Sequence, residues 1–320
     1  MQPDGRLHLG NYLGALRNWV QLQDAYDCYY TIVDYHALTT LADSAQMRPL
    51  VYDMALDWLA AGLDPKRSVI FIQSDVPEVA ELHLLLSMVT PLSWLERVPT
   101  YKEKREQNPE NINYGLLGYP LLQAADILIY KGERVPVGED QLAHIELTRE
   151  IARRFNHLHQ RNVFVEPQAL LTETPKILGT DGVHKMSKSR NNVIPLTATR
   201  EQVEAIVRTM VTDVERPRRA DPGHPERCNV CGLHRIFSPD SWEDIWEGER
   251  TARTGCVEVK QLLAQRINDF LEPIRERRRE LAEDPDTVWD ILGDGADRAR
   301  LVAAETLSAA RYAMGLRYSG

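Results

Sequence analysis

Two short apolar runs, separated by a long helical segment, constrain the fold of this 320-residue chain more than any other feature. Residues 28–35 (CYYTIVDY) and 68–73 (SVIFIQ) are rich in β-branched and aromatic side chains, which is typical of strands buried on both faces. Residues 43–61, between them, have the spacing of a helix. Strand, helix and strand in this order predict a parallel sheet with right-handed crossovers.

The end of the first predicted strand is a candidate binding position. Ligands of parallel sheets bind beyond the carboxyl ends of the strands. Asp34, Tyr35 and His36 lie at such an end. His36 therefore fits a ligand-binding role as well as it fits the role of a packed loop histidine.

Composition and charge fit an ordinary globular enzyme. Charged residues make up 27% of the chain and hydrophobic residues 43%. No uncharged apolar run reaches about 18 residues, and the N-terminus has no basic-then-apolar signal, so we expect a cytoplasmic chain that binds no membrane. The net charge of −9 does not indicate a nucleic-acid binder, although a basic face can coexist with an acidic whole.

Residues 184–192 (HKMSKSRNN) form the most distinctive polar stretch. Lys185 and Lys188 are spaced by serines in a run with almost no apolar anchor, which predicts a mobile surface loop. Flexible ammonium groups, with the hydroxyls of Ser187 and Ser189, suit a polyphosphate. Taken alone, a solvated loop with two ordinary lysines is the simpler interpretation.

A second motif near the N-terminus supports the polyphosphate interpretation. Residues 3–5 (PDG) predict a turn, and the apolar spacing that follows predicts an amphipathic helix to about Ala25. His8 and Gly10, in the sequence HLGN, would then stand at the helix N-terminus. Free backbone N–H groups and the helix dipole favour phosphate there, and a glycine lets a flat base approach the backbone.

Residues 118–130 (GYPLLQAADILIY) predict a buried helix, because apolar residues occupy nearly its whole circumference and Pro120 fits a first turn. Asp126 is a carboxylate in this helix and needs a hydrogen-bond donor, from the protein or from a ligand. Helical spacing places Tyr119, Gln123 and Asp126 on one face. The pattern indicates a small-molecule pocket; a buried aspartate that caps a neighbouring loop is the structural alternative.

A further strand end is predicted at Gly138. Glu139 and Asp140 would open the next helix, where acidic residues suit the dipole. Because this is again the carboxyl end of a strand, an acidic side chain here could instead hold ribose hydroxyls.

Together, HLGN and KMSKS (residues 185–189) resemble the two signatures of class I aminoacyl-tRNA synthetases. The segments YPLLQAADIL (119–128) and VPVGEDQLAHIELTR (135–149) are similar to tryptophanyl-tRNA synthetases of the bacterial type, and the likeness covers nearly the whole chain. It implies a Rossmann-like, parallel-sheet α/β catalytic domain over residues 1–195 and a smaller all-α domain over residues 196–320. The helical domain would bind the tRNA anticodon, and its last helix would pack back on the catalytic domain.

The resemblance also implies ligands and partners: L-tryptophan, ATP with Mg²⁺, tRNA(Trp) and a second copy of the chain in a homodimer. Asp126 would accept the indole N–H, and Tyr119 and Gln141 would hold the α-ammonium group. The pocket walls would be His36, Gln123, Val135 and Val137. Contacts to ATP would come from Gln2, Pro3, Asp4, Gly10, Asn11, Gly138, Glu139, Asp140, Ile177, Lys185, Met186, Ser187, Lys188 and Ser189.

Four residues would act on the phosphates by resemblance: His8, Lys104, Lys185 and Lys188. Lys104 belongs to residues 102–113, whose composition predicts a surface loop. In the helical part, helices are expected over 200–211, 241–249, 257–282, 285–292 and 295–316. Two arginine-rich runs, 216–219 and 275–279, are candidate contacts to the tRNA backbone, although a solvated helix face is the simpler interpretation of the second.

The cysteines allow two interpretations. Some relatives hold an iron–sulfur cluster through four cysteines, two of them in a GCxxC run, but here that run is GCVEV (255–259) and lacks the last ligand. Reduced thiols without metal are the first interpretation. Zinc is the alternative, bound through Cys228, Cys231, His234 and Cys256.

The N-terminus departs from the family pattern. Relatives carry a short strand and a Ser-Gly turn before the Gln2-Pro3 pair, whereas this sequence starts at Met1. We expect either that the true start lies upstream or that the sheet lacks a strand and the pocket a wall. Three rival functions remain open: a tyrosyl synthetase, a simple nucleotidylyltransferase, which would not explain KMSKS, and a non-catalytic paralogue that binds tryptophan, nucleotide or a protein partner.

Overall fold

Parallel strand pairs form the centre of the N-terminal α/β part. The computed structural model describes residues 1–320 except 40–42, 108, 172–176 and 317–320. The strands are β1 (Cys28–Ile32), β2 (Ser68–Ile72), β3 (Arg134–Val137) and β4 (Gln168–Leu171). Within the described residues, β1 pairs only with β2 and β3 only with β4, both in parallel. The predicted parallel α/β class is confirmed, and the first strand is shorter than expected because a helix begins at Asp34.

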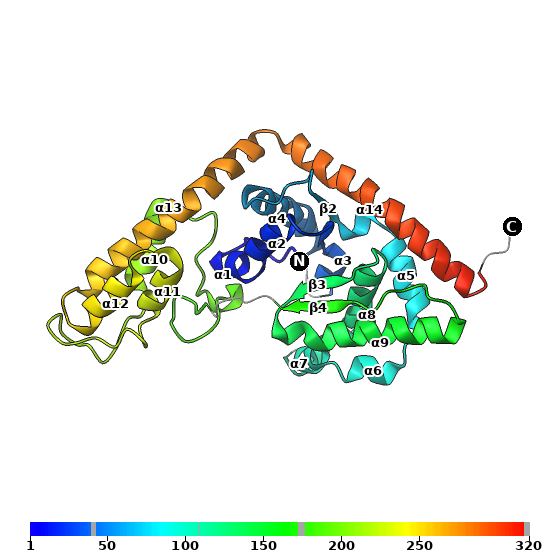
Figure 1. Ribbon diagram of the computed structural model, residues 1–320, viewed down its shortest axis with the longest axis horizontal. Helices are drawn as coiled ribbons and strands as arrows, with labels where there is room; N and C mark the ends of the chain where they lie inside the picture. Colours follow the sequence, from blue (N-terminus) through cyan, green and yellow to red (C-terminus); the bar gives the residue numbers. More distant parts are fainter. Residues whose placement is uncertain (40–42, 108, 172–176, 317–320) are drawn as a thin grey trace.

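Helices surround these strands and make up the C-terminal part (Figure 1). One helical run covers α1 (Leu9–Asn11), a π-helical segment (Tyr12–Leu16) and α2 (Arg17–Leu22). The others are α3 (Asp34–Ala37), α4 (Met47–Ala60), α5 (Glu78–Ser87), α6 (Leu92–Glu96), α7 (Pro99–Gln107), α8 (Tyr114–Leu128), α9 (Leu142–His159), α10 (Arg200–Thr209), α11 (Asn229–Phe237), α12 (Trp242–Arg250), α13 (Cys256–Glu283) and α14 (Pro285–Ala313). Short 3₁₀ turns cover Ser44–Gln46, Gln73–Asp75, Pro109–Asn111, Glu139–Gln141 and Lys188–Arg190.

Three local predictions were wrong. The segment expected as a loop from residue 102 is helical to Gln107, in α7. Pro120 lies inside α8 rather than in its first turn, because the helix already begins at Tyr114, where Asn113 caps it by accepting the N–H of Leu116. The predicted break near residue 293 is absent from α14, which is continuous.

Gly295 explains why α14 does not break there. A Cβ at this position would lie 1.9 Å from the backbone oxygen of Ile70 in β2. The glycine therefore allows the helix to lie directly against the strand, instead of ending the helix. Along its length α14 packs on β2 and α5, so the last helix returns to the N-terminal α/β part.

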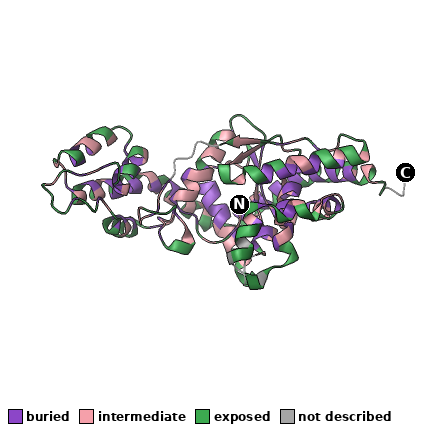
Figure 2. Cartoon of the chain, turned by 90° about the horizontal axis from the view of Figure 1, so that it is seen from below, coloured by how far each residue is buried: buried purple, intermediate pink, exposed green. Residues whose placement is uncertain are grey.

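The two longest helices shape the molecule. In Figure 1, α13 and α14 meet at an angle, and α13 leads away to the cluster formed with α10, α11 and α12. The other end of α13 packs on α4. Figure 2 shows buried residues on the inward faces of the helices and exposed residues on the outer faces. None of the helices in the described ranges has the length and apolar character needed to cross a membrane.

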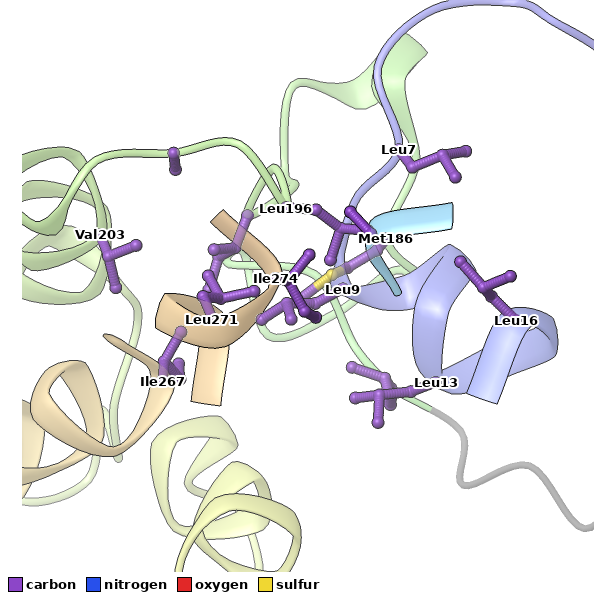
Figure 3. Close-up of a cluster of buried hydrophobic side chains, with 14 of the residues drawn as sticks. Leu7, Leu9, Leu13, Leu16, Met186, Leu196, Val203, Ile267, Leu271 and Ile274 are labelled. Carbon is purple, nitrogen blue, oxygen red and sulfur yellow. The ribbon is translucent and has the colours of Figure 1, made fainter. Parts of the chain in front are cut away.

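A single hydrophobic cluster joins the N-terminal helix, the KMSKS segment and α13 (Figure 3). Leu9 and Leu13 come from the first helical run, Met186 from the KMSKS segment, and Leu271 and Ile274 from α13. The cluster holds both signature motifs in place through one shared core.

Candidate active site

The HLGN segment lies at a helix N-terminus, as predicted. The helix begins at Leu9, and His8 precedes it in an extended conformation. His8 donates its backbone N–H to Asn11 Oδ1, and its carbonyl accepts the N–H groups of Asn11 and Tyr12. A Cβ on Gly10 would lie 2.9 Å from His8 Nδ1 and 3.0 Å from Met186 Cβ. Gly10 is therefore required for the imidazole and the KMSKS segment to approach this turn so closely.

The KMSKS segment faces HLGN across a pocket of about 860 Å³. Residues 184–190 line one side, and Asp4, His8, Gly10 and Asn11 line the other. Lys188 Nζ crosses this space, donating to Asp4 Oδ1 at 2.5 Å and to the Gly5 carbonyl at 3.0 Å. The structure thus brings the two signatures together, although about 175 residues separate them in the sequence.

The KMSKS segment is anchored more firmly than its composition predicts. Lys185 is exposed, but the neighbouring Met186 side chain is buried in the shared core. Asn192, also buried, accepts the N–H of Ser187 and donates to Asp181 and to the Lys185 carbonyl. The expectation of a run without an apolar anchor was therefore wrong. The anchoring roles of Asn192 and Asp181 were missed, because polar residues in a polar run give no sign of burial.

Electrostatics make His8 a neutral hydrogen-bonding group in the free protein. Burial lowers its pKa to about 4, and the nearby Lys188 lowers the pKa further than Asp4 raises it. Within the described residues, His8 Nδ1 and Gln2 Nε2 are buried without a hydrogen-bond partner. Buried polar atoms of this kind are costly, so both suit a ligand that supplies the missing partner.

A second polar cluster surrounds Asp126 on α8. Gln73 Nε2 donates to both carboxylate oxygens, at 2.9 and 2.8 Å. His36 Nδ1 lies 3.1 Å from Gln73 Nε2 and 3.6 Å from Asp126 Oδ2. His36 follows β1 and Gln73 follows β2, so the carboxyl ends of two paired strands meet α8 here. Gln73 was missed, although its place after a buried strand is the same signal that singled out His36.

Three further predicted pocket residues, Tyr119, Gln123 and Val135, lie around Asp126. The ring of Tyr119 lies edge-on to His36, with 4.4 Å between centroids, and burial raises its pKa to about 12. Gln123 Oε1 is buried and has no partner within the described residues. Val135 lines a cavity of about 740 Å³ together with Asp126.

The remaining predicted site residues lie in three places: after β3, beside the KMSKS segment and in α7. Val137 ends β3, and the four residues that follow are Gly138, Glu139, Asp140 and Gln141, at the carboxyl end of that strand. Gln141 donates to Asp140 Oδ2 at 2.9 Å. Ile177 is buried beside the KMSKS segment in the shared core. The backbone of Lys104 lies in α7, and its side chain lies outside the described residues.

The four candidate zinc ligands do not form a metal site. The His234 ring contacts Ser238 Oγ at 2.8 Å and the Val259 carbonyl at 3.0 Å, so both nitrogens are occupied within the protein. Cys228 precedes α11, and a hydrogen bond from Cys231 lowers the pKa of the Cys228 thiol. In the part of the chain that the structure describes, no group of three or more His, Cys, Asp or Glu side chains could hold a metal ion.

Comparison with known proteins defines the class to which this fold and pocket belong. The family described as tRNA synthetases class I (W and Y) matches residues 1–272. The chain belongs to this family of aminoacyl-tRNA synthetases.

Several relatives that match almost the whole chain are tryptophan–tRNA ligases. The chain is 50% identical over 324 residues to the tryptophan–tRNA ligase of Thermotoga maritima, with 99% of this chain and 98% of the relative covered. It is 43% identical to the ligase of Aquifex aeolicus, again over 99% and 98%. The tryptophanyl-tRNA synthetase of Campylobacter jejuni, solved with ADP and tryptophan, superposes with a TM-score of 0.91 at 34% identity over 98% of each chain. These likenesses support the tryptophan–tRNA ligase interpretation over the three rivals.

Proposed function

We propose that the chain activates L-tryptophan with ATP, releasing pyrophosphate, and transfers the tryptophanyl group from the adenylate to the 2′-OH of the terminal adenosine of tRNA(Trp), in the cytoplasm. The observation that carries the proposal is the convergence of two sites. HLGN and KMSKS face each other across one pocket, and β1, β2 and α8 bring His36, Gln73 and Asp126 together nearby.

Asp126 supplies specificity in this proposal. Its carboxylate accepts the indole N–H, while Tyr119 and Gln141 hold the α-ammonium group. Phenylalanine cannot donate this hydrogen bond and would leave a buried acceptor unpaired, which discriminates more strongly than a missing methylene does. Gln73 holds both carboxylate oxygens and so fixes the direction in which the acceptor points.

The phosphate chemistry rests on alignment and charge. The tryptophan carboxylate attacks the α-phosphate, so no side chain is needed as a covalent nucleophile. Lys185 and Lys188 stabilise charge on the phosphate oxygens, Lys188 after leaving Asp4. Neutral His8 contributes a hydrogen bond rather than a charge.

Mg²⁺ is part of the proposal as a companion of ATP. Among the described residues that line the pocket, Asp4 is the one carboxylate. This donor set fits a magnesium ion held mainly by the phosphates, where it would neutralise their charge.

Residues 196–320 are proposed to bind the tRNA anticodon region. Fewer arginines of the runs 216–219 and 275–279 are available to contact the tRNA backbone than the composition of these runs indicates. Arg216 is buried and paired with Glu249 at 2.6 Å, and Arg278 is paired with two aspartates, so neither is available to a phosphate backbone. Arg218 and Arg219 are exposed and remain candidates, whereas Arg277 belongs to the solvated face of α13.

The activity is tested by tryptophan-dependent ATP–pyrophosphate exchange, with tyrosine and phenylalanine as controls. Exchange with tryptophan alone is expected. A folded protein that shows no exchange would contradict the catalytic proposal and favour a role limited to binding.

Tryptophan affinity is expected to weaken as the pH falls below about 7. Burial raises the Asp126 pKa to about 7, although the hydrogen bond from Gln73 and the charge of the Met1 amino group act in the opposite direction. Protonation removes the ionised acceptor, so the dissociation constant should rise up to about tenfold per pH unit below the pKa. Calorimetric titration between pH 5.5 and 8.5 measures it. A pH-independent affinity, or the same slope in Asp126→Asn, would contradict the assignment.

The homodimer is proposed to form through the α5–α6 region. Leu84, Met88 and Leu92 are large apolar residues with 53%, 67% and 57% of their surface exposed. Such clustering is typical of an interface. Met88→Glu should shift the mass in solution from twice 36.5 kDa to 36.5 kDa, measured by light scattering. Leu301→Glu, at a 76% exposed position on α14, is the matched control and should stay dimeric. A Met88→Glu variant that remains dimeric would exclude this surface.

A further inference from the structure

We infer that Arg278 is a positioning residue, which couples α13 of the helical part to the backbone that leads into HLGN. Arg278 donates from Nε to Asp57 Oδ1 and from Nη2 to Asp53 Oδ1, both at 2.7 Å. Both aspartates belong to α4. The other oxygen of Asp57, Oδ2, accepts the backbone N–H of Leu7 at 3.3 Å. One carboxylate therefore connects α13 with the residue that immediately precedes His8.

The segment that receives this contact is held on its other side by the chain that follows KMSKS. The carbonyl of Leu7 accepts the N–H of Leu196 at 3.0 Å, and the N–H of Leu9 donates to the Ile194 carbonyl at 2.9 Å. Figure 3 shows Leu9, Leu196 and Met186 near Ile274 of α13, and Leu7 belongs to the same buried cluster. The backbone around His8 thus lies between Asp57 and residues 194–196, and Arg278 holds Asp57.

Burial makes this ion pair unlike the surface pairs of the chain. Only 1% of the Asp57 side chain is exposed, and 22% of that of Arg278. Burial raises the pKa of Asp57, and Arg278 opposes that effect. Without the guanidinium, Asp57 would be a buried charge lacking its counter-ion, and it would protonate or draw in water. Either change weakens the ionised acceptor that fixes Leu7 N–H.

The same helix provides a matched control. Arg277 is the sequence neighbour of Arg278 but is exposed. Replacing each arginine by methionine removes one positive charge from the same turn of α13. Only Arg278→Met removes the contact to α4, so a general effect of charge or helix propensity would appear in both variants.

The experiment compares both full-length variants with the wild type at a temperature well below unfolding. It measures the hydrogen exchange of the peptide covering residues 5–13 and the KM for ATP. The second measurement rests on the proposed function, whereas the first does not. Arg278→Met is expected to speed amide exchange in this peptide on the order of tenfold. It is also expected to change KM for ATP or kcat on the order of 10- to 100-fold, because small displacements at a reacting centre slow the reaction strongly. The dissociation constant for tryptophan should not change. Arg277→Met should match the wild type.

A different result is expected if the Arg278–Asp57 ion pair contributes only to the stability of the fold. The melting temperature of Arg278→Met would then fall, while amide exchange over residues 5–13 and KM for ATP below the transition would equal those of the wild type, and this outcome overturns the inference. If Arg278→Met does not fold, Arg278→Gln keeps the stem and one donor and is expected to show the same faster exchange. Absence of pyrophosphate exchange in the wild type would count against the proposed function and leave the amide measurement decisive.

Discussion

Replacing Asp126 by asparagine should abolish tryptophan-dependent ATP–pyrophosphate exchange while the protein stays folded. The carboxylate is nearly buried, with 10% of its side chain exposed, and Gln73 holds both oxygens. The asparagine has almost the same volume but offers the indole N–H an uncharged acceptor, or an amide N–H in place of an acceptor. A loss in kcat/KM on the order of 10²- to 10⁴-fold is expected, because sites built for a substrate N–H reject a mismatched partner strongly.

Loss of stability would not explain this result. The folded-state pKa of Asp126 is raised to about 7 from 3.8, so its ionisation opposes folding. Protonated Asp126 therefore adds to the free energy of unfolding. This contribution is fully present below the unfolded-state pKa and is lost as the pH rises towards 7. At pH 8 the Asp126→Asn variant should therefore melt no lower than the wild type.

The matched control for this prediction is Asp75→Asn. Asp75 lies in the 3₁₀ turn after β2, and burial raises its pKa as well, but the charged groups that act on its carboxyl are Asp34 and Arg300 rather than Asp126. It should keep tryptophan-dependent exchange within a few-fold of wild type. Undiminished exchange in Asp126→Asn would remove Asp126 from the specificity site, and equal losses in both variants would indicate a general disturbance of this strand edge.

An extension of about seven residues before Met1, alternating apolar and polar side chains, should raise both the melting temperature and the exchange activity. Met1 donates its N–H to the Thr31 carbonyl at 2.8 Å and accepts the Val33 N–H at 3.0 Å, which are the two bonds of one rung in a parallel ladder with β1. Residues added before Met1 would continue along β1, into the 740 Å³ cavity that β1 and β3 both line.

The extension would change the energetics in two ways. It would place a strand between β1 and β3, joining two strand pairs into one sheet and burying apolar side chains in the cavity. It would also remove a buried amino group, whose pKa burial lowers to about 5. Ordering of the added residues offsets part of the gain. A rise in melting temperature on the order of 5 °C is expected.

The control for the extension has the same length and composition but carries two prolines, which cannot donate to the ladder. Scanning calorimetry and tryptophan-dependent exchange compare the three proteins. The amide hydrogens of β1 and β3 should exchange more slowly in the extended chain, and in neither of the other two proteins. Equal melting and equal turnover of the extended and original chains would refute the predicted strand.

Sequence patterns predicted the parts of this protein that depend on neighbours along the chain. Apolar β-rich runs identified β1 and β2, although only β2 is buried on both faces and every second residue of β1 is half-buried. The turn and periodicity around His8 predicted the start of the first helix. Local breakers were less reliable: Pro120 and Gly295 lie inside helices, because tertiary packing outweighs the local preference of a single residue.

The sequence by itself thus determined the α/β class, the positions of β1 and β2 and the two signature motifs, since periodicity and residue type are properties of one segment. Only the tertiary structure decided which segments meet. Gln73 and Asp126 are 53 residues apart, and Arg278 and Asp57 are 221 apart, yet each pair shares a hydrogen bond. Met186 became a core residue because α13 and the first helix cover it. Partners of this kind are chosen by how helices and strands pack, which no local pattern records.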